Sequence, residues 1–274
     1  MKLKYLIIAF SIIIVIVILV SVLFPVFLAE SGYIENVQYI VLPLFIFIVL
    51  LLIFLGIFFY FNYRLFSLLE REDWPALAYY LEQKIYQKGS YSERNVKLLA
   101  SSYLVMTDYL SVLKLENKAM LVKPSVVAKN VLIFGSARVL SGNNKEAAVF
   151  FKTHLDKGKL NEKEVQWVRW YYGFSQLLTG DFKLAMPEFI SLAMSSRDSL
   201  ITGLSAYFLQ NTIAKTCEKE ECLKTAENGK NRVKAIIRNP AEWAKEAGKM
   251  NTDIHIAIIR KYVDEAGKWI FAAV

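Results

Sequence analysis

Cysteine and histidine are the side chains of this chain best suited to bind a metal or to act as nucleophile and base, and each type occurs twice. Cys217 and Cys222 are five residues apart. This spacing does not place two thiols on one face of a helix, and it is not the spacing of zinc or dithiol sites. His154 and His255 lie far apart in the sequence, with no companion pattern of carboxylates. The sequence therefore predicts neither a metal site nor a disulfide framework.

The motifs that mark other kinds of active site are incomplete or missing in the sequence. Ser175 follows Gly173 as in a nucleophile elbow, but Leu177 stands where that motif has its second glycine. No glycine-rich loop suited to hold a phosphate is present. We therefore expect a protein that is not an enzyme and that binds no cofactor.

A basic run between residues 224 and 238 is the remaining cluster with binding chemistry. After Glu227 it contains no acidic residue. The simplest interpretation is a solvated helix face. The alternative is lipid contact, because the cytoplasmic membrane surface attracts basic residues at about 1 kcal/mol per charge. Nucleic acid is disfavoured, since the run is short and has no interleaved aromatic residues. The predicted lipid-contact residues are Lys230, Arg232, Lys234 and Arg238.

The composition predicts that helices position all of these residues. The chain has 274 residues, of which 55% are hydrophobic, but only 12 glycines and 6 prolines. So few helix-breaking residues favour long helices with short connections, and we expect an all-α fold. The net charge of +8 comes entirely from residues 62–274.

Two long apolar runs predict transmembrane helices. Residues 5–29 and 36–63 contain no charged residue, and about 20 apolar residues suffice to cross a bilayer core. The segment between them has no Lys or Arg, whereas Lys2 and Lys4 precede the first run and Arg64 follows the second. The positive-inside rule places both termini in the cytoplasm, so we expect a two-pass protein of the bacterial inner (cytoplasmic) membrane. The absence of ionisable residues within the runs favours an anchor over a transport pathway.

Residues 167–192 predict two antiparallel helices joined by a short turn. A small residue occurs midway along each helix, where two backbones would approach closely, and large residues lie on the faces that would interlock. Asn161 and Glu164 form a capping-box pattern shortly before the first helix. The residues that characterise the two helices and their turn are Gly173, Gly180, Asp181, Phe182, Ala185 and Phe189. Their pattern resembles a tetratricopeptide repeat, and this resemblance implies helical hairpins that stack into an α-solenoid and bind protein partners.

Three earlier hairpins fall into the same register. The residues at the place of the alanine are Leu77, Val112, Ala147 and Ala185, with spacings of 35, 35 and 38 residues. The repeat of the family has about 34 residues. The resemblance covers residues 58–195 and is strongest in the fourth unit. The alternative is a generic array of helical hairpins, because small residues at such spacing suit any close helix crossing.

Helices are also predicted for particular segments within and beyond the repeats, residues 125–140 being the first helix of the third hairpin. The second apolar run is expected to continue as a helix past residue 63. Residues 125–140, 198–216 and 253–271 each predict one helix, and residues 218–238 predict a helix that is interrupted near Gly229. The last helix is expected to cap the solenoid.

The resemblance implies a protein-binding groove, because the first helix of each hairpin lines the concave face in this family. Basic side chains at one end and aromatic ones at the other would suit a peptide with acidic and apolar residues. The alternative is that the aromatic residues pack against the next helix or the C-terminal segment, since aromatic residues at helical spacing are more often core. The predicted protein-binding residues are Arg94, Lys97, Lys129, Trp167, Trp170 and Phe174.

These inferences predict three parts: a transmembrane hairpin anchor (1–61), tetratricopeptide-like repeats (62–195), and helical C-terminal repeats with a cap (196–274). The predicted function is a membrane-anchored scaffold that binds and positions other proteins, whether as a homo- or a hetero-oligomer. One instance is a structural part of a large envelope assembly, such as a flagellar-motor accessory structure, and no residue selects it over other assemblies. The alternatives are a lipid- or peptide-sensing membrane module, or a non-catalytic subunit of a membrane enzyme or transporter.

Overall fold

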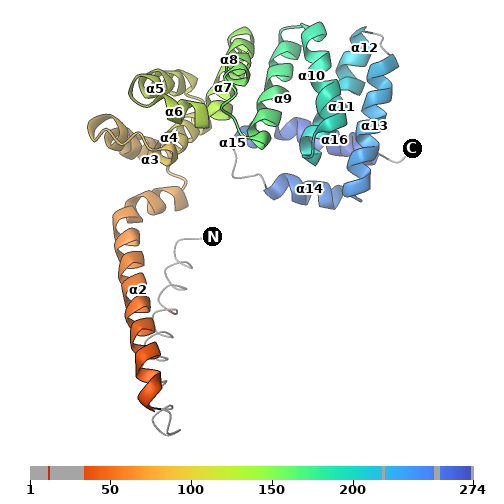
Figure 1. Ribbon diagram of the computed structural model, residues 1–274. Helices are drawn as coiled ribbons and strands as arrows, with labels where there is room; N and C mark the ends of the chain where they lie inside the picture. The colour runs from red at the N-terminus through yellow and green to blue at the C-terminus, as the bar shows by residue number, and fades with distance from the viewer. Residues whose placement is uncertain (1–11, 13–33, 218–219, 250–253, 273–274) are drawn as a thin grey trace. The chain divides into compact units, whose positions relative to one another are not determined.

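The computed structural model describes residues 12, 34–217, 220–249 and 254–272 (Figure 1). Within these ranges the chain forms helices and no strand, which confirms the predicted all-α fold. The first predicted transmembrane run, residues 5–29, lies outside the described residues except for Ile12. The chain divides into two compact units, Met1–Tyr80 and Leu81–Val274.

One long apolar helix dominates the first unit. α2 (Ile34–Glu70) is followed after a tight turn by α3 (Trp74–Glu82), in which the division between the units falls. Residues Ile46–Glu70 of α2 contain an 18-residue stretch with a mean hydropathy of 2.5 and are long and apolar enough to cross a membrane. As predicted, the helix continues past the apolar run without a break.

The second unit is a succession of helices joined mostly by short turns (Figure 1). From α4 to α13, neighbours in the chain are neighbours in space, so that each element packs on the next. The elements are η1 (Gln83–Gln87), α4 (Glu93–Val105), α5 (Tyr109–Val122), α6 (Pro124–Lys129), α7 (Val131–Leu140), α8 (Asn144–Asp156), α9 (Glu162–Leu178), α10 (Phe182–Ser195), α11 (Ser199–Phe208), η2 (Leu209–Ile213), α12 (Ala214–Cys217), α13 (Glu220–Ile236), α14 (Pro240–Lys249), α15 (Ile254–Ile258) and α16 (Arg260–Phe271).

The same turn recurs four times along the chain. At each turn a residue of positive φ is followed by one whose amide N–H donates to the carbonyl oxygen five residues earlier, which is the C-cap of a Schellman motif. The positive-φ residues are Glu72, Thr107, Gly142 and Gly180. The amide bonds are Asp73 to Leu68, Asp108 to Tyr103, Asn143 to Arg138 and Asp181 to Gln176, at 3.2, 2.9, 2.9 and 2.9 Å. The turns are 35, 35 and 38 residues apart, the spacing that the sequence register predicts.

The last three helices run back along the stack. α15 packs against α7, α16 packs against α11, and α14 packs against α16. A Cβ atom added at Gly203 or Gly267 would lie 2.6 Å from the ring of Trp243, so both glycines are needed for this approach. The indole Nε1 of Trp243 donates to the carbonyl of Val263 at 3.0 Å. The segment therefore reaches along the stack as far as α7, further than a cap confined to the last helix.

Several helix breaks differ from the prediction. Residues 125–140 form two helices because the chain breaks at Asn130, whose side-chain amide donates to the carbonyl of Val126 at 2.8 Å and so competes with the backbone. Residues 198–216 contain the π-helical turn η2, and the last predicted helix is divided at Ile259 into α15 and α16. The interruption predicted near Gly229 is absent, and α13 continues through this residue. The glycine lets α13 pack closely against Ala206 of α11.

The predicted domain boundaries do not coincide with visible breaks. The division between compact units falls at Tyr80 rather than at residue 61. One hydrophobic cluster extends from Val131 to Ile270 and crosses the predicted boundary at residue 195. The three-part division stays a prediction.

Candidate protein-binding site

The aromatic residues of the predicted groove are buried. Trp167, Trp170 and Phe174 follow one another along α9 with only 1%, 0% and 3% of their surfaces exposed. The rings of Trp170 and Phe174 stack with their centroids 5.1 Å apart. All three side chains belong to the hydrophobic cluster of the second unit. This agrees with the alternative interpretation of the sequence, in which the aromatic residues are part of the core.

The chain's own C-terminal helices cover Trp167 and Phe174. The hydroxyl of Tyr171 donates to the carbonyl of His255 at 2.6 Å. The rings of Trp167 and His255 lie 5.2 Å apart, and those of Phe174 and Tyr262 lie 5.4 Å apart. With these contacts in place, a partner could meet the three aromatic residues only where Trp167 lines a cavity, so their role in binding stays a prediction.

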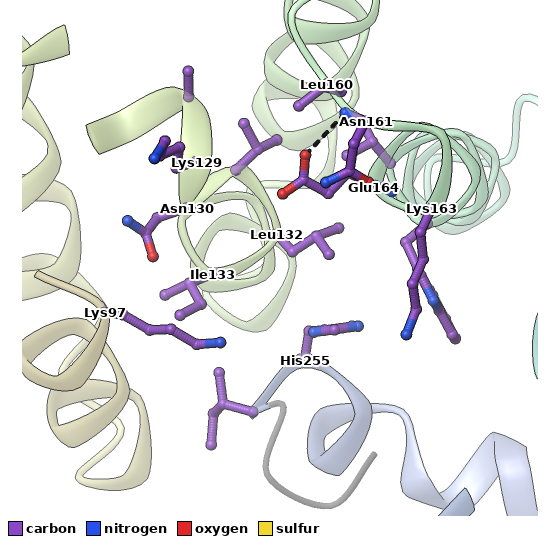
Figure 2. Close-up of a pocket in the computed structure, with 15 residues that line it drawn as sticks. Lys97, Lys129, Asn130, Leu132, Ile133, Leu160, Asn161, Lys163, Glu164 and His255 are labelled. Atoms are coloured by element: carbon purple, nitrogen blue, oxygen red, sulfur yellow. Dashed lines mark hydrogen bonds between the residues drawn. The ribbon is translucent and has the colours of Figure 1, made fainter. Parts of the chain in front are cut away.

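The basic end of the predicted groove contains a cavity of about 240 Å³ (Figure 2). Its lining comes from α4, α6, α7, α9 and α15 and brings together three of the predicted residues, Lys97, Lys129 and Trp167. Figure 2 shows Lys97 and Lys163 approaching the space from opposite sides, with His255 beside it. Apolar side chains, including those of Val131, Leu132 and Val168, complete the wall. Arg94 lies exposed on α4 and does not line the cavity.

Polar contacts position the charged residues of this cavity. Lys129 lies 2.9 Å from Glu93, and the hydrogen bond to this carboxylate raises the pKa of Lys129. The predicted capping box is confirmed: Glu164 N–H donates to the side chain of Asn161 at 2.9 Å, and Asn161 N–H donates to that of Glu164 at 3.1 Å. The box fixes the first turn of α9 and with it the position of Lys163. With three lysines against one glutamate, the lining carries positive charge.

One buried polar group on the cavity wall is unsatisfied. The indole Nε1 of Trp167 has no hydrogen-bond partner in the part of the chain that the structure describes. A buried donor left without an acceptor costs about 1–3 kcal/mol. The apolar wall and the lysines of the cavity suit a ligand that has an apolar part and oxygen acceptors.

Sequence reasoning missed two important residues of the cavity. His255 belongs to a segment beyond the repeats, and no local pattern links it to α9. Lys163 precedes the repeat positions of the fourth unit, so the register did not select it. Its position could still have been predicted, because the capping box of Asn161 and Glu164 marks the start of α9 and places Lys163 in the first turn.

The predicted lipid-contact residues do not share one contact. Lys230 lies 5.1 Å from the ring centroid of Trp269. The guanidinium of Arg232 donates to the carbonyls of Ala193 and Ser196 at the end of α10. Lys234 is half-buried and Arg238 is exposed. Two of the four residues thus contact other parts of the chain, and the lipid contact stays a prediction.

Candidate metal ligands are scattered over the described ranges. There, no three Cys, His, Asp or Glu side chains lie close enough to hold a metal ion. The thiol of Cys222 is buried in the hydrophobic cluster. His154 contacts the carbonyl of Phe150 through Nδ1 at 2.9 Å and is likewise buried.

The sequence matches a family model and a bacterial relative. The family model described as "Uncharacterised Treponema protein" matches residues 111–272. An "Uncharacterized protein" of Treponema pallidum (strain Nichols) is 26% identical over 224 residues, which cover 77% of this chain and 69% of the relative. The family match includes the cavity-lining parts of α6, α7, α9 and α15 but begins after α4, which contributes Lys97.

Proposed function

The chain belongs to the family described as "Uncharacterised Treponema protein", and we propose that it is a membrane-anchored scaffold that binds and positions other proteins. Its helical-repeat domain would hold the partner, and its apolar N-terminal part would hold the complex at the membrane. A scaffold of this kind needs neither catalysis nor a cofactor.

The observation that carries the proposal is the recurrence of one turn at intervals of 35, 35 and 38 residues. The residues that align with the alanine of the repeat, Leu77, Val112, Ala147 and Ala185, are all fully buried. This periodicity supports a stack of hairpins similar to tetratricopeptide repeats, that is, an α-solenoid. Such stacks present extended surfaces that bind other proteins.

The apolar part of α2 supports a membrane anchor. Its side chains include Phe54, Tyr60 and Phe61 with 66%, 81% and 71% of their surfaces exposed. Aromatic residues gather where a helix leaves the hydrocarbon core, and positive charge follows on the cytoplasmic side. We therefore place the membrane boundary near Tyr60 to Arg64, with a second pass formed by residues 5–29 and both termini in the cytoplasm.

Within this proposal the partner binds at the basic cavity, where Lys97, Lys129 and Lys163 converge. Arg94, one turn before Lys97, adds charge nearby on α4. The aromatic residues of α9 then act mainly as the core that fixes the cavity wall. Assembly into a larger envelope structure would need further contacts, which the exposed apolar side chains of α5, such as Leu110 and Leu121, are suited to supply.

Crosslinking in native membranes tests the proposal. The full chain would be crosslinked in cells, purified in detergent and compared with an uncrosslinked sample by mass spectrometry. We expect a reproducible set of crosslinked proteins. Recovery of the chain alone, in repeated preparations and at several crosslinker lengths, would contradict a scaffold.

The membrane topology needs a separate measurement. Tags at either terminus should be protected from protease in intact spheroplasts and cleaved after lysis. Cleavage of the C-terminal tag in intact spheroplasts would place the helical domain outside the cytoplasm.

A further inference from the structure

The geometry points to the cavity between α4, α7, α9 and α15 as the site that binds one apolar side chain of a short acidic segment of a partner protein. This inference rests on the proposed scaffold function and names the class of partner. Size, charge, an unsatisfied donor and the closure of the neighbouring surface each support it.

The size of the cavity fits one side chain. Its volume of about 240 Å³ lies below the roughly 300–1,000 Å³ of pockets that hold drug-sized ligands. Leu132, Val131 and Val168 supply apolar wall, and burial of apolar surface is favourable whatever the direction of the side chain. A single aliphatic or aromatic anchor would therefore enter, while the chain on either side of it stays at the mouth.

The charge around the mouth selects the residues next to the anchor. Lys97, Lys129 and Lys163 come from three different helices, and Lys97 and Lys163 approach the cavity from opposite sides (Figure 2). Glu93 engages Lys129, and Glu164 is held in the capping box. The three lysines and one glutamate of the lining favour carboxylates beside the anchor, because complementary charge steers association and disfavours basic partners.

An unsatisfied donor suits a peptide backbone. Nε1 of Trp167 is buried and has no acceptor among the described residues, and Trp167 lines the cavity. Because Nε1 itself is enclosed, a carbonyl or carboxylate oxygen of the bound segment would reach it only if the indole of Trp167 shifted on binding. Trp170, one helical turn further along α9, has a buried Nε1 without an acceptor in the described part of the chain as well, but it does not line the cavity.

The surface beyond α9 limits the length of the bound segment. There α15 and α16 occupy the face that a longer peptide would follow, as the contacts of Tyr171 with His255 and of Phe174 with Tyr262 show. A partner that enters the cavity can extend toward α4 but not along the aromatic side chains of α9. The recognised segment is therefore short.

Peptide binding to the full chain in detergent tests the inference. The probe is a fluorescein-labelled nonapeptide with a central leucine flanked by four acidic residues on each side. Two comparison peptides carry serine in the centre or lysine in place of the acidic residues. Fluorescence anisotropy should show affinity in the order leucine, serine, lysine. Equal binding of the leucine and serine peptides would overturn the anchor, and equal binding of the leucine and lysine peptides would overturn the charge selection.

Charge-reversal variants locate the site. The double variant K97E/K163E should bind the leucine peptide about tenfold more weakly, since each lysine contributes only modestly at an exposed position. The control K145E/K183E changes the net charge equally at exposed lysines of α8 and α10 that do not line the cavity. Equal loss in both variants would mean nonspecific attraction, and the inference would fail.

The tryptophan donors give a second, independent test. Trp167→Phe keeps an aromatic ring but removes the N–H, so it should weaken peptide binding severalfold, whereas Trp170→Phe should leave it unchanged at similar thermal stability. Equal binding by both variants would overturn the role of Nε1. Competition by octanoate without any peptide binding would mean that a small acid, and not a protein segment, occupies the cavity. Failure of all these tests alongside a reproducible crosslinked set would overturn the inference but leave the scaffold proposal standing.

Discussion

The helices α4–α6 and the helices α7–α16 are stabilised by different kinds of contact. In α4–α6 the buried apolar residues are mostly aliphatic, and polar pairs connect the elements: Tyr103 donates to Glu82 at 2.5 Å, and Glu116 pairs with Arg138 of α7 at 2.6 Å. From α7 onward a single cluster rich in aromatic rings joins the helices. The first region depends on a few directional contacts, and the second on packing that many residues share.

One aligned position makes this difference concrete. Four residues after the place of the alanine, the hairpins carry Leu81, Glu116, Phe151 and Phe189, all buried. Phe151 contacts the Cβ position of Gly135, and Phe189 lies near that of Gly173. In the second hairpin a carboxylate takes the place of the ring and needs Arg138 as its partner. A repeat can therefore keep its turn and its helices while the chemistry of its interior changes.

The largest effect is expected from Trp170→Ala. Its ring contacts those of Phe174, Phe189 and Phe208 in the aromatic cluster, and loss of a buried tryptophan costs about 3–5 kcal/mol. Denaturant unfolding of the full chain in detergent, followed by circular dichroism, would measure the change. Lys183→Ala on the surface of α10 is the control. A loss below about 1 kcal/mol would mean that the cluster is not the main source of stability.

Glu116→Ala should have the next largest effect. It leaves Arg138, whose side chain is 16% exposed, without its carboxylate, and breaking a buried pair on one side costs about 3–5 kcal/mol. The double change E116L/R138M should recover most of this loss, because it gives the second hairpin an apolar interior like that of its neighbours. If the single and double variants were equally unstable, the ion pair would not be the relevant contact.

Gly267→Ala probes how the C-terminal helices attach. A Cβ there would lie 2.6 Å from Trp243, and overpacking of this kind costs about 1–3 kcal/mol. Limited proteolysis should cut the variant near α14–α16 before it cuts α9. Gly56→Ala, where a Cβ meets nothing within 4 Å, is the matched control and should not destabilise the chain. Unchanged proteolysis of Gly267→Ala would mean that Trp243 can shift at little cost.

The turns should respond differently in the two regions. Gly180 has a φ of 82° and Thr107 a φ of 59°. Gly180→Ala should cost about 1 kcal/mol, because an L-residue strains this conformation. Thr107→Gly relieves such strain but adds freedom to the unfolded chain, so its net effect should be smaller than that of Gly180→Ala. Thermal unfolding of both variants would check the order. Equal and opposite shifts would show that unfolded-state entropy contributes little at these turns.

Acid should weaken the second region slightly through His154. Burial lowers the pKa of this side chain below its usual value of about 6.5. The unfolded chain then binds the proton more readily, so stability should fall as the pH drops below about 6.5 toward the folded pKa. His154→Gln should remove this component when unfolding is compared at pH 7.5 and 5.5. A wild-type chain that became more stable on acidification through this histidine would contradict a lowered pKa.

Local patterns predicted the elements well, but they left distant contacts as open alternatives. The capping box at Asn161 and the turn at Gly180 depend on residues close in sequence, so both could be predicted. The break at Asn130 and the role of Gly229 depend on competing hydrogen bonds and on helix crossings, which periodicity does not encode. The repeat register assigned Lys97 and Lys129 to one surface, and both line the same cavity. The closure of the aromatic end did not follow from the register, because Tyr171 and His255 are 84 residues apart.

The hydrogen bond between Tyr171 and the carbonyl of His255 has a consequence for synthesis. α9 leaves the ribosome long before α15 and α16, and domains fold as units while the chain emerges. Until those last helices arrive, the rings of Phe174 and Phe208 lack the contact with Tyr262 and remain available to chaperones and to other nascent chains. A stop codon before α15 would leave this apolar surface exposed in the finished protein. We therefore expect quality-control proteases to remove the shortened product.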